Sequence, residues 1–430
     1  KRQRMLELGA FPVDRIEFGP ATKWTDNTLY VNPEEIENVV KQDDRIDWVG
    51  IDAVNPGDST RIINRYDEVE PRVKVDGQGQ AYPAIVGRDP VAIGVGKTHR
   101  LANMSVVGCV DATAGEIDDP GQRARSAHPF HTRVNFIDKS GPGAVTFSAA
   151  KAHVCVTLEQ PPDTSTEYWH TVAQGTIMRV ADLLARVIAS EEPPEVEVFD
   201  TTPKPGLPGV VFIPHLTTPE LYRGPYTKTG TTVYGITRAA PPWVLGPMEL
   251  LDGAIAQIRS TMYTENPTNL ELLRRHGKDW NYLACLAYPT NWGMESEKAA
   301  VSARAARTAK MLGAAGAIVT TDVRGQRMIE TMLTIQACER EGIKVVFLTE
   351  EEDPENGTAP PFLTWVSELE TIVSTGTGGW DGPFPAVETV IGARAPEESW
   401  YEEQPAVHGR YAVSHLGDHY GFGKQSYADY

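Results

Sequence analysis

The chain alternates strand-length apolar runs with helix-length amphipathic segments from Tyr282 onward, and this alternation restricts the possible folds most. The predicted elements are a strand at Tyr282–Tyr288, a helix at Glu295–Leu312, a strand at Ala317–Thr321, a helix at Gln326–Glu341, and strands at Lys344–Thr349 and Glu370–Ser374. Strands that alternate with helices at this spacing favour right-handed crossovers between parallel strands. The pattern therefore predicts an α/β region with a parallel, doubly wound sheet.

The first 160 residues have a different pattern, in which short alternating runs are separated by Pro, Gly and Asp turns. The predicted strands are Arg15–Phe18, Thr28–Val31, Asp47–Val54, Thr60–Asn64, Arg72–Val75, Met104–Val110, Val134–Ile137 and Ala152–Leu158. Many short strands with turn signals are typical of an antiparallel barrel or sandwich. We therefore predict a β-rich N-terminal domain, and an α/β (α+β overall) class for the whole chain.

Four segments follow from these patterns. Residues 1–160 form the β-rich domain, 161–260 a middle domain of helix and strands, 261–395 the doubly wound domain, and 396–430 a C-terminal arm. Apolar residues recur at helical spacing after Met248, which predicts an amphipathic helix up to Arg259. Ser260 and Thr261 interrupt this pattern. A second helix is then expected up to Gly277.

The composition limits the partners and the compartment. The formal net charge is −18, from 40 basic and 58 acidic residues, which argues against nucleic acid and against anionic membranes. No apolar run is long enough to span a bilayer. The four cysteines are far apart and form no CxxC pair, so we expect buried core thiols and a cytoplasmic location.

Several motifs occur in one collinear order along nearly the whole chain. They are EPRVKVDG (Glu70–Gly77), GVGKTH (Gly94–His99), TVYGI (Thr232–Ile236), DGAI (Asp252–Ile255), ELLRRHGKDWNY (Glu271–Tyr282), GIKVVFLTEE (Gly342–Glu351) and GFGK (Gly421–Lys424). With these motifs the chain resembles the α/β proprotein of component B of the glycine, sarcosine and betaine reductases. GVGKTH is not a phosphate loop, because Val91 stands where such a loop needs glycine.

The resemblance implies a processing site. In that family the proprotein cuts itself before a cysteine, which becomes a pyruvoyl group that captures the substrate amine. The aligned pair here is Arg259-Ser260, and no cysteine lies between Cys155 and Cys285. A serine could carry out the same chemistry if the peptide were strained and a base were positioned. The alternative is that Ser260 is simply a loop residue. We expect a divergent, unprocessed member, with no pyruvoyl group and an intact chain.

The function implied by the resemblance is that of a subunit in a heteromeric reductase. Its expected partner is a second component-B-type subunit with a redox cysteine or selenocysteine. Its expected substrate is a small nitrogen compound, in which a C–N or C–heteroatom bond is cleaved. Two alternatives stay open: a non-catalytic scaffold subunit, and a metal-assisted hydrolase or lyase on the same fold.

Candidate site residues come from the strand ends and the motifs, because open parallel sheets bind ligands beyond the carboxyl ends of their strands. The candidate catalytic residues are Ser260, Asp322, Arg324 and Glu350. The candidate substrate-binding residues are Lys97, His99, Asn291, Thr321, Gly376 and Gly378. Helix capping or solvated loop positions are the alternative for the acidic members.

One further pair concerns a metal. His128 and His131 lie three residues apart, in HPFH. A divalent metal is possible there, but it would need a third protein ligand. The alternative is that two histidines in a loop stand together without a shared ligand.

Overall fold

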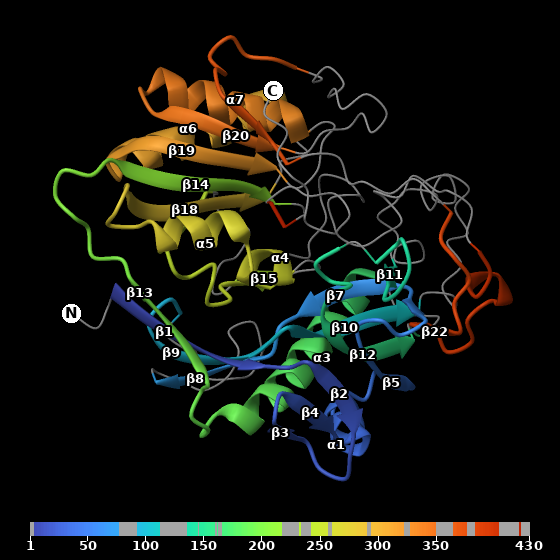
Figure 1. The fold of residues 1–430 in the computed structure, drawn as a ribbon. Helices are drawn as coiled ribbons and strands as arrows, with labels where there is room; N and C mark the ends of the chain where they lie inside the picture. The colour runs from blue at the N-terminus through green and yellow to red at the C-terminus, as the bar shows by residue number, and fades with distance from the viewer. Residues whose placement is uncertain are drawn as a thin grey trace.

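The computed structural model describes residues 4–76, 93–111, 136–144, 146–159, 161, 166–216, 232–233, 242–256, 260–289, 294–321, 327–349, 364–375, 383–403 and 421–422. The strands of the N-terminal half lie at one end of the molecule and the parallel sheet lies at the other (Figure 1). The short helix α4 (Ser260–Thr264) lies between these two parts.

The N-terminal part is rich in strands. Its elements are β1 (Met5–Pro12), β2 (Arg15–Phe18), β3 (Lys23–Thr25), β4 (Thr28–Val31), α1 (Pro33–Val40), β5 (Val49–Val54), β6 (Thr60–Ile62), β7 (Arg65–Val69), β8 (Arg72–Asp76), β9 (Gly96–Ala102), β10 (Met104–Asp111), β11 (Ile137–Asp138), β12 (Ala152–Glu159), α3 (Thr166–Ala185), η3 (Arg186–Ile188), β13 (Glu195–Asp200) and the distant β22 (Thr389–Ile391). The two larger sheets have the orders β13-β1-β9-β8 and β5-β12-β10-β7.

The predicted β-rich class is confirmed, but the prediction of antiparallel strands throughout is wrong. β1 pairs with β9 in parallel, and β10 pairs with β12 in parallel. In both cases a long stretch of chain, rather than a hairpin turn, separates the two strands. A long connection allows the chain to return in the same direction, and the sheets are therefore mixed.

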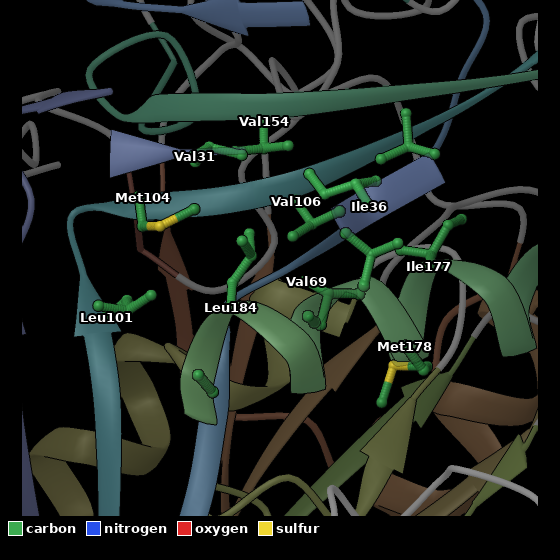
Figure 2. Close-up of a cluster of buried hydrophobic side chains, with 14 of the residues drawn as sticks. Val31, Ile36, Val69, Leu101, Met104, Val106, Val154, Ile177, Met178 and Leu184 are labelled. Carbon is green, nitrogen blue, oxygen red and sulfur yellow. The ribbon is translucent and has the colours of Figure 1, made fainter. Parts of the chain in front are cut away.

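The core of this part forms where helix α3 packs on strands of both sheets. Ile177 and Leu184 of α3 are fully buried, and so are Val106 and Val154 of the central strands. Figure 2 shows these side chains together with Val69. Burial of one large aliphatic side chain contributes about 1.5–3 kcal/mol, so this cluster is the main stabilising element of the N-terminal part.

The second half holds the predicted parallel sheet, and the prediction is confirmed. Its elements are β14 (Gly209–Leu216), β15 (Thr232–Val233), β16 (Trp243–Leu245), β17 (Ile255–Ala256), α4 (Ser260–Thr264), α5 (Pro267–Arg274), β18 (Asn281–Pro289), α6 (Glu295–Met311), β19 (Ala314–Thr321), α7 (Arg327–Arg340), β20 (Lys344–Thr349), β21 (Ile372–Ser374) and η5 (Glu398–Trp400). The sheet order is β16-β18-β14-β19-β20-β21. All neighbours pair in parallel except β16, which is antiparallel at the edge.

Helices cover both faces of this sheet. Helices α6 and α7 pack side by side and form one apolar cluster with β14, β19 and β20. Helix α5 packs on the opposite face, against β14 and β18. Residues 161–260, predicted as a middle domain, contribute to both parts of the molecule: α3 packs in the N-terminal core, and β14 lies in the parallel sheet.

The predicted helix from Met248 to Arg259 is wrong over its described residues. The chain makes successive turns up to Gly253, which has φ +90°, and then forms β17. Leu250, Leu251 and Ala254 are buried, so the apolar positions were identified correctly. Local backbone hydrogen bonds, such as that from the Asp252 N–H to the Met248 carbonyl at 3.0 Å, close the turns, and the apolar side chains pack in the core. The helix α4 begins at Ser260, where the sequence pattern predicted an interruption.

Two simpler expectations concern cysteines and membrane spans. All four cysteines are free and buried, as predicted. Burial raises the pKa of each thiol, which keeps the thiols protonated and unreactive. Within the described part of the chain, no helix combines the length and the apolar character that crossing a membrane requires.

Candidate active site around Ser260

Ser260 is the first residue of α4 and is almost fully buried. Its hydroxyl donates a hydrogen bond of 2.8 Å to Oδ2 of Asp67, on β7. Its backbone N–H donates a second hydrogen bond of 3.0 Å to Oδ1 of the same carboxylate. One side chain of the N-terminal part therefore holds the start of α4 at two atoms.

Asp67 is completely buried and accepts two more hydrogen bonds. Nε2 of Gln174, on α3, donates to Oδ2 at 2.8 Å, and the backbone N–H of Glu68 donates to Oδ1 at 2.7 Å. Burial raises the pKa of Asp67 from 3.8 to about 6, although the hydrogen bonds from Ser260, Gln174 and Glu68 oppose this rise. A carboxylate that titrates close to neutral pH and accepts from a hydroxyl is suited to polarise that hydroxyl.

A second buried carboxylate fixes the turn that precedes α4. Asp252 accepts hydrogen bonds from Thr98 Oγ1 at 2.6 Å, from the backbone N–H of Gly94 at 2.7 Å and from Lys74 Nζ at 2.5 Å. Lys74 also donates to the carbonyl of Val95 at 2.8 Å. Three of the sequence motifs, EPRVKVDG, GVGKTH and DGAI, thus meet at one carboxylate.

Buried cations hold the rest of this segment. Arg72 donates to the carbonyls of Leu251 and of Thr264, the last residue of α4. Its guanidinium also pairs with Glu70 at 2.8 Å. Just beyond α4, Glu265 accepts two hydrogen bonds of 2.6 Å from Lys151. Buried charges are retained only when they are paired and hydrogen-bonded. Charged side chains of β7 and β8 bind the two ends of α4, Asp67 at Ser260 and Arg72 at Thr264.

The structure separates the predicted site residues. Lys97 is half exposed on β9 and pairs with Glu7 at 2.9 Å, and this contact raises the pKa of Lys97. His99 is buried, with Nδ1 2.8 Å from the carbonyl of Ile188. Thr321 is buried at the end of β19. None of the contacts described for Lys97 or His99 includes Ser260, and their roles in substrate binding stay predictions.

The other predicted residues lie outside the described residues. They are Asp322, Arg324, Glu350, Asn291, Gly376, Gly378, His128 and His131. Among the residues that the structure does describe, no group of three or more His, Cys, Asp or Glu side chains could hold a metal ion.

Asp67 was missed in the sequence, as was the role of Asp252. The signal for Asp67 is the run RYDEVEPRVKVD at residues 65–76, in which charged and apolar residues are mixed along the two strands β7 and β8. Charges at that density usually indicate a solvated face. Here every residue of β7 is buried, and both α3 and α4 pack against the strand.

Comparison with known proteins gives one consistent answer. A family model described as "Glycine/sarcosine/betaine reductase component B subunits" matches residues 4–401. The sarcosine reductase complex component B subunit alpha of Peptoclostridium acidaminophilum is 29% identical over 90% of this chain and 89% of the relative.

Two further relatives agree with the family model. The betaine reductase complex component B subunit alpha of Peptoclostridium acidaminophilum is 30% identical over 90% of this chain and 87% of the relative. The glycine reductase complex component B subunits alpha and beta of Acetoanaerobium sticklandii are 26% identical over 90% of this chain and 88% of the relative. No solved structure matches the chain.

Proposed function

Because the chain belongs to the family of glycine/sarcosine/betaine reductase component B subunits, we propose that it is a subunit of a heteromeric reductase complex. Its reaction cleaves a C–N or C–heteroatom bond of a small nitrogen compound. Its partner is a second component-B-type subunit that supplies a redox cysteine or selenocysteine. The names of the relatives, all subunits of reductase complexes, support the heteromeric assembly.

The observation that carries the proposal is the hydrogen bond from the Ser260 hydroxyl to the buried Asp67 carboxylate. A hydroxyl that donates to an anion becomes a stronger acceptor at its own oxygen. That oxygen can then accept a hydrogen bond from an N–H group or from a cationic nitrogen of the substrate. In this proposal Ser260 orients the nitrogen, and Asp67 is a positioning residue that fixes the hydroxyl.

A pyruvoyl group, which the resemblance implies, does not fit this site. Residue 260 gives Asp67 two of its four described hydrogen bonds, both as a donor. A pyruvoyl group has only acceptor oxygens and would place one of them against the carboxylate. Each lost hydrogen bond to a buried group costs about 1–3 kcal/mol. We therefore propose that the chain works uncleaved.

Intact-mass spectrometry tests this part. We expect one chain of about 47 kDa, with Ser260→Ala changing only the mass of that side chain. In self-cleavage an acyl group moves from N to Oγ of residue 260, with the help of a base. The experiment is decisive because Asp67 contacts both of these atoms of Ser260 and could be that base. Two fragments split before residue 260, the second reacting with a carbonyl reagent, would contradict the proposal.

Activity of the natively purified complex tests the role of Ser260. We expect Ser260→Ala to lower kcat/KM about 10- to 100-fold, which corresponds to the loss of one hydrogen bond to a charged group. Thr264→Val is the matched control, because it removes a hydroxyl from the same helix that only donates to the Ser260 carbonyl at 3.4 Å. Full activity in both variants would favour the scaffold alternative.

A further inference from the structure

A cavity of about 270 Å³ lies where the N-terminal strands meet the parallel sheet. Its walls come from the residue before β1, the segment after β13, the segment before β9, the turn after β16 and the start of β18. Neither Ser260 nor Asp67 lines it. Pockets for drug-sized ligands have volumes of about 300–1,000 Å³, so this cavity suits a smaller ligand.

The walls of the cavity are largely apolar. Met248, Tyr282 and Leu283 are among the lining residues, and the Tyr282 hydroxyl is already used, since it donates to Oδ1 of Asn269 at 2.7 Å. The other polar side chains in the lining are Arg4, Thr201 and Glu249.

The two charged side chains of the lining differ in their contact with water. Arg4 is exposed, so water and salt screen its charge. Glu249 is half-buried in the turn after β16. The carboxylate of Glu249 therefore sets the charge that a ligand meets inside the cavity.

The Glu249 carboxylate has one protein partner. Its Oε2 accepts a hydrogen bond of 2.9 Å from the backbone N–H of Gly246. Within the described part of the chain, Oε1 has neither a hydrogen-bond nor an ion-pair partner. The side chain is also held in place by close packing, because a Cβ atom at Gly94 would lie 2.9 Å from Cγ of Glu249. Gly94 has φ +74°, which a side chain would rarely adopt.

Neighbouring buried carboxylates have a cation, which Glu249 lacks. Asp252 pairs with Lys74 at 2.5 Å, and Glu265 pairs with Lys151 at 2.6 Å. Burial raises the pKa of Glu249, the Gly246 N–H opposes this rise, and the Asp252 charge adds to it. A positive charge beside Oε1 would stabilise the ionised carboxylate and replace the water lost on burial.

We infer that this cavity binds a small organic cation, a primary alkylammonium. The ammonium group pairs with Oε1 of Glu249 and can also donate to the Thr201 hydroxyl, while the apolar walls hold the alkyl chain. A divalent metal ion fits less well, because calcium takes about 6–8 oxygen ligands and the lining offers a single carboxylate. The inference does not depend on the function proposed for Ser260.

Titration calorimetry of the full chain with three ligands of equal carbon number tests the site. The ligands are propylammonium, propionate and β-alanine, which carry a positive charge, a negative charge and both. Sodium chloride keeps the ionic strength equal. We expect saturable binding of propylammonium with a dissociation constant of about 1 mM, an affinity that four non-hydrogen atoms can supply. Propionate should not bind, and β-alanine should bind more weakly than propylammonium.

Variants of the lining provide the controls. Glu249→Gln keeps an acceptor for the Gly246 N–H but removes the charge, and it should weaken propylammonium binding about tenfold or more. Asp200→Asn should leave binding unchanged. Asp200 is a fair match because it also accepts from a backbone N–H, that of Thr202 at 2.9 Å, and lies next to Thr201 but outside the lining.

Two further variants keep the test valid if Glu249→Gln does not fold. Thr201→Val should weaken propylammonium binding several-fold, because it removes the hydroxyl acceptor. Arg4→Gln should leave the affinity equal or make it tighter, because it removes a positive charge from the lining.

Binding of propylammonium by the wild type and by Asp200→Asn, together with its loss in Glu249→Gln, supports the site. Unchanged affinity in Glu249→Gln overturns it, and so does a wild-type chain that does not bind propylammonium. Tighter binding of propionate or of β-alanine would show that the ligand needs a negative charge, and would overturn the assignment to a cation.

Discussion

Replacement of Asp67 by Asn should change how the free energy of unfolding depends on pH. The folded protein raises the pKa of Asp67 from 3.8 to about 6, chiefly through burial. A group whose pKa is raised in the folded state stabilises the fold fully at pH values below the unfolded pKa. That stabilisation is lost as the pH rises through the folded pKa. For Asp67 the loss occurs between about pH 3.8 and about pH 6.

The expected magnitude follows from the two pKa values. At about 1.4 kcal/mol for each pH unit, the difference corresponds to about 3 kcal/mol in total. About 2 kcal/mol of this falls between about pH 4.5 and about pH 7.5. Asn does not titrate, so the stability of Asp67→Asn relative to the wild type should rise by about 2 kcal/mol over that interval.

Urea unfolding at several pH values, followed by tryptophan fluorescence, measures this difference. Other titrating groups cancel when the two proteins are compared at the same pH. The control is Asp200→Asn, because hydrogen bonds from Thr202 lower the pKa of the exposed Asp200 and should give a small trend of opposite sign. When Asp67→Asn is compared with Asp67 in a Ser260→Ala background, the rise in relative stability should occur at higher pH. The reason is that Ser260→Ala removes a hydrogen bond that lowers the pKa of Asp67. A flat difference between Asp67→Asn and the wild type, or a fall with rising pH, would refute the reasoning.

Three further predictions concern stability, assembly and activity. Asp252→Asn should lower the free energy of unfolding by about 3–5 kcal/mol in urea titrations, because it leaves the buried Lys74 without its carboxylate; the exposed Asp279→Asn should cost at most about 1 kcal/mol. The natively expressed chain should be isolated with a different second subunit, and a fully active monomer in light scattering would contradict this. Replacing Asp322 or Arg324, which lie outside the described residues, by Ala should lower activity far more than the melting temperature, and unchanged activity would show that both are structural.

The order of elements in the second half could be predicted because each signal is local. Strand β20 has the predicted bounds, and β18, α6, β19 and α7 differ from theirs by one to three residues. Helical and strand periodicity depend on residues a few positions apart, and buried parallel strands are apolar along their whole length. The segment after Met248 shows the limit of this reasoning. Its apolar spacing identified buried residues, but burial in a turn produces the same spacing as a helix.

The charged strands of the N-terminal half were harder to interpret. A run such as RYDEVEPRVKVD gives no local reason for burial, since charged side chains are ordinarily solvated. In the structure Asp67, Glu70, Arg72 and Lys74 are all buried, and Asp67, Arg72 and Lys74 have partners from distant parts of the chain. The motif EPRVKVDG, which contains three of these residues, indicated the family but not their contacts.

The sequence by itself determined the alternation of strands and helices, the buried cysteines and the resemblance to a reductase family, because each depends on residue types in local order. Only the tertiary structure decided which carboxylate faces Ser260. Asp67 is 193 positions away in the chain, and no periodicity relates residues at that distance. Its burial is tolerated because a serine, a glutamine and a backbone amide from three different elements supply hydrogen bonds that replace water. That compensation exists only once β7, α3 and α4 have packed together.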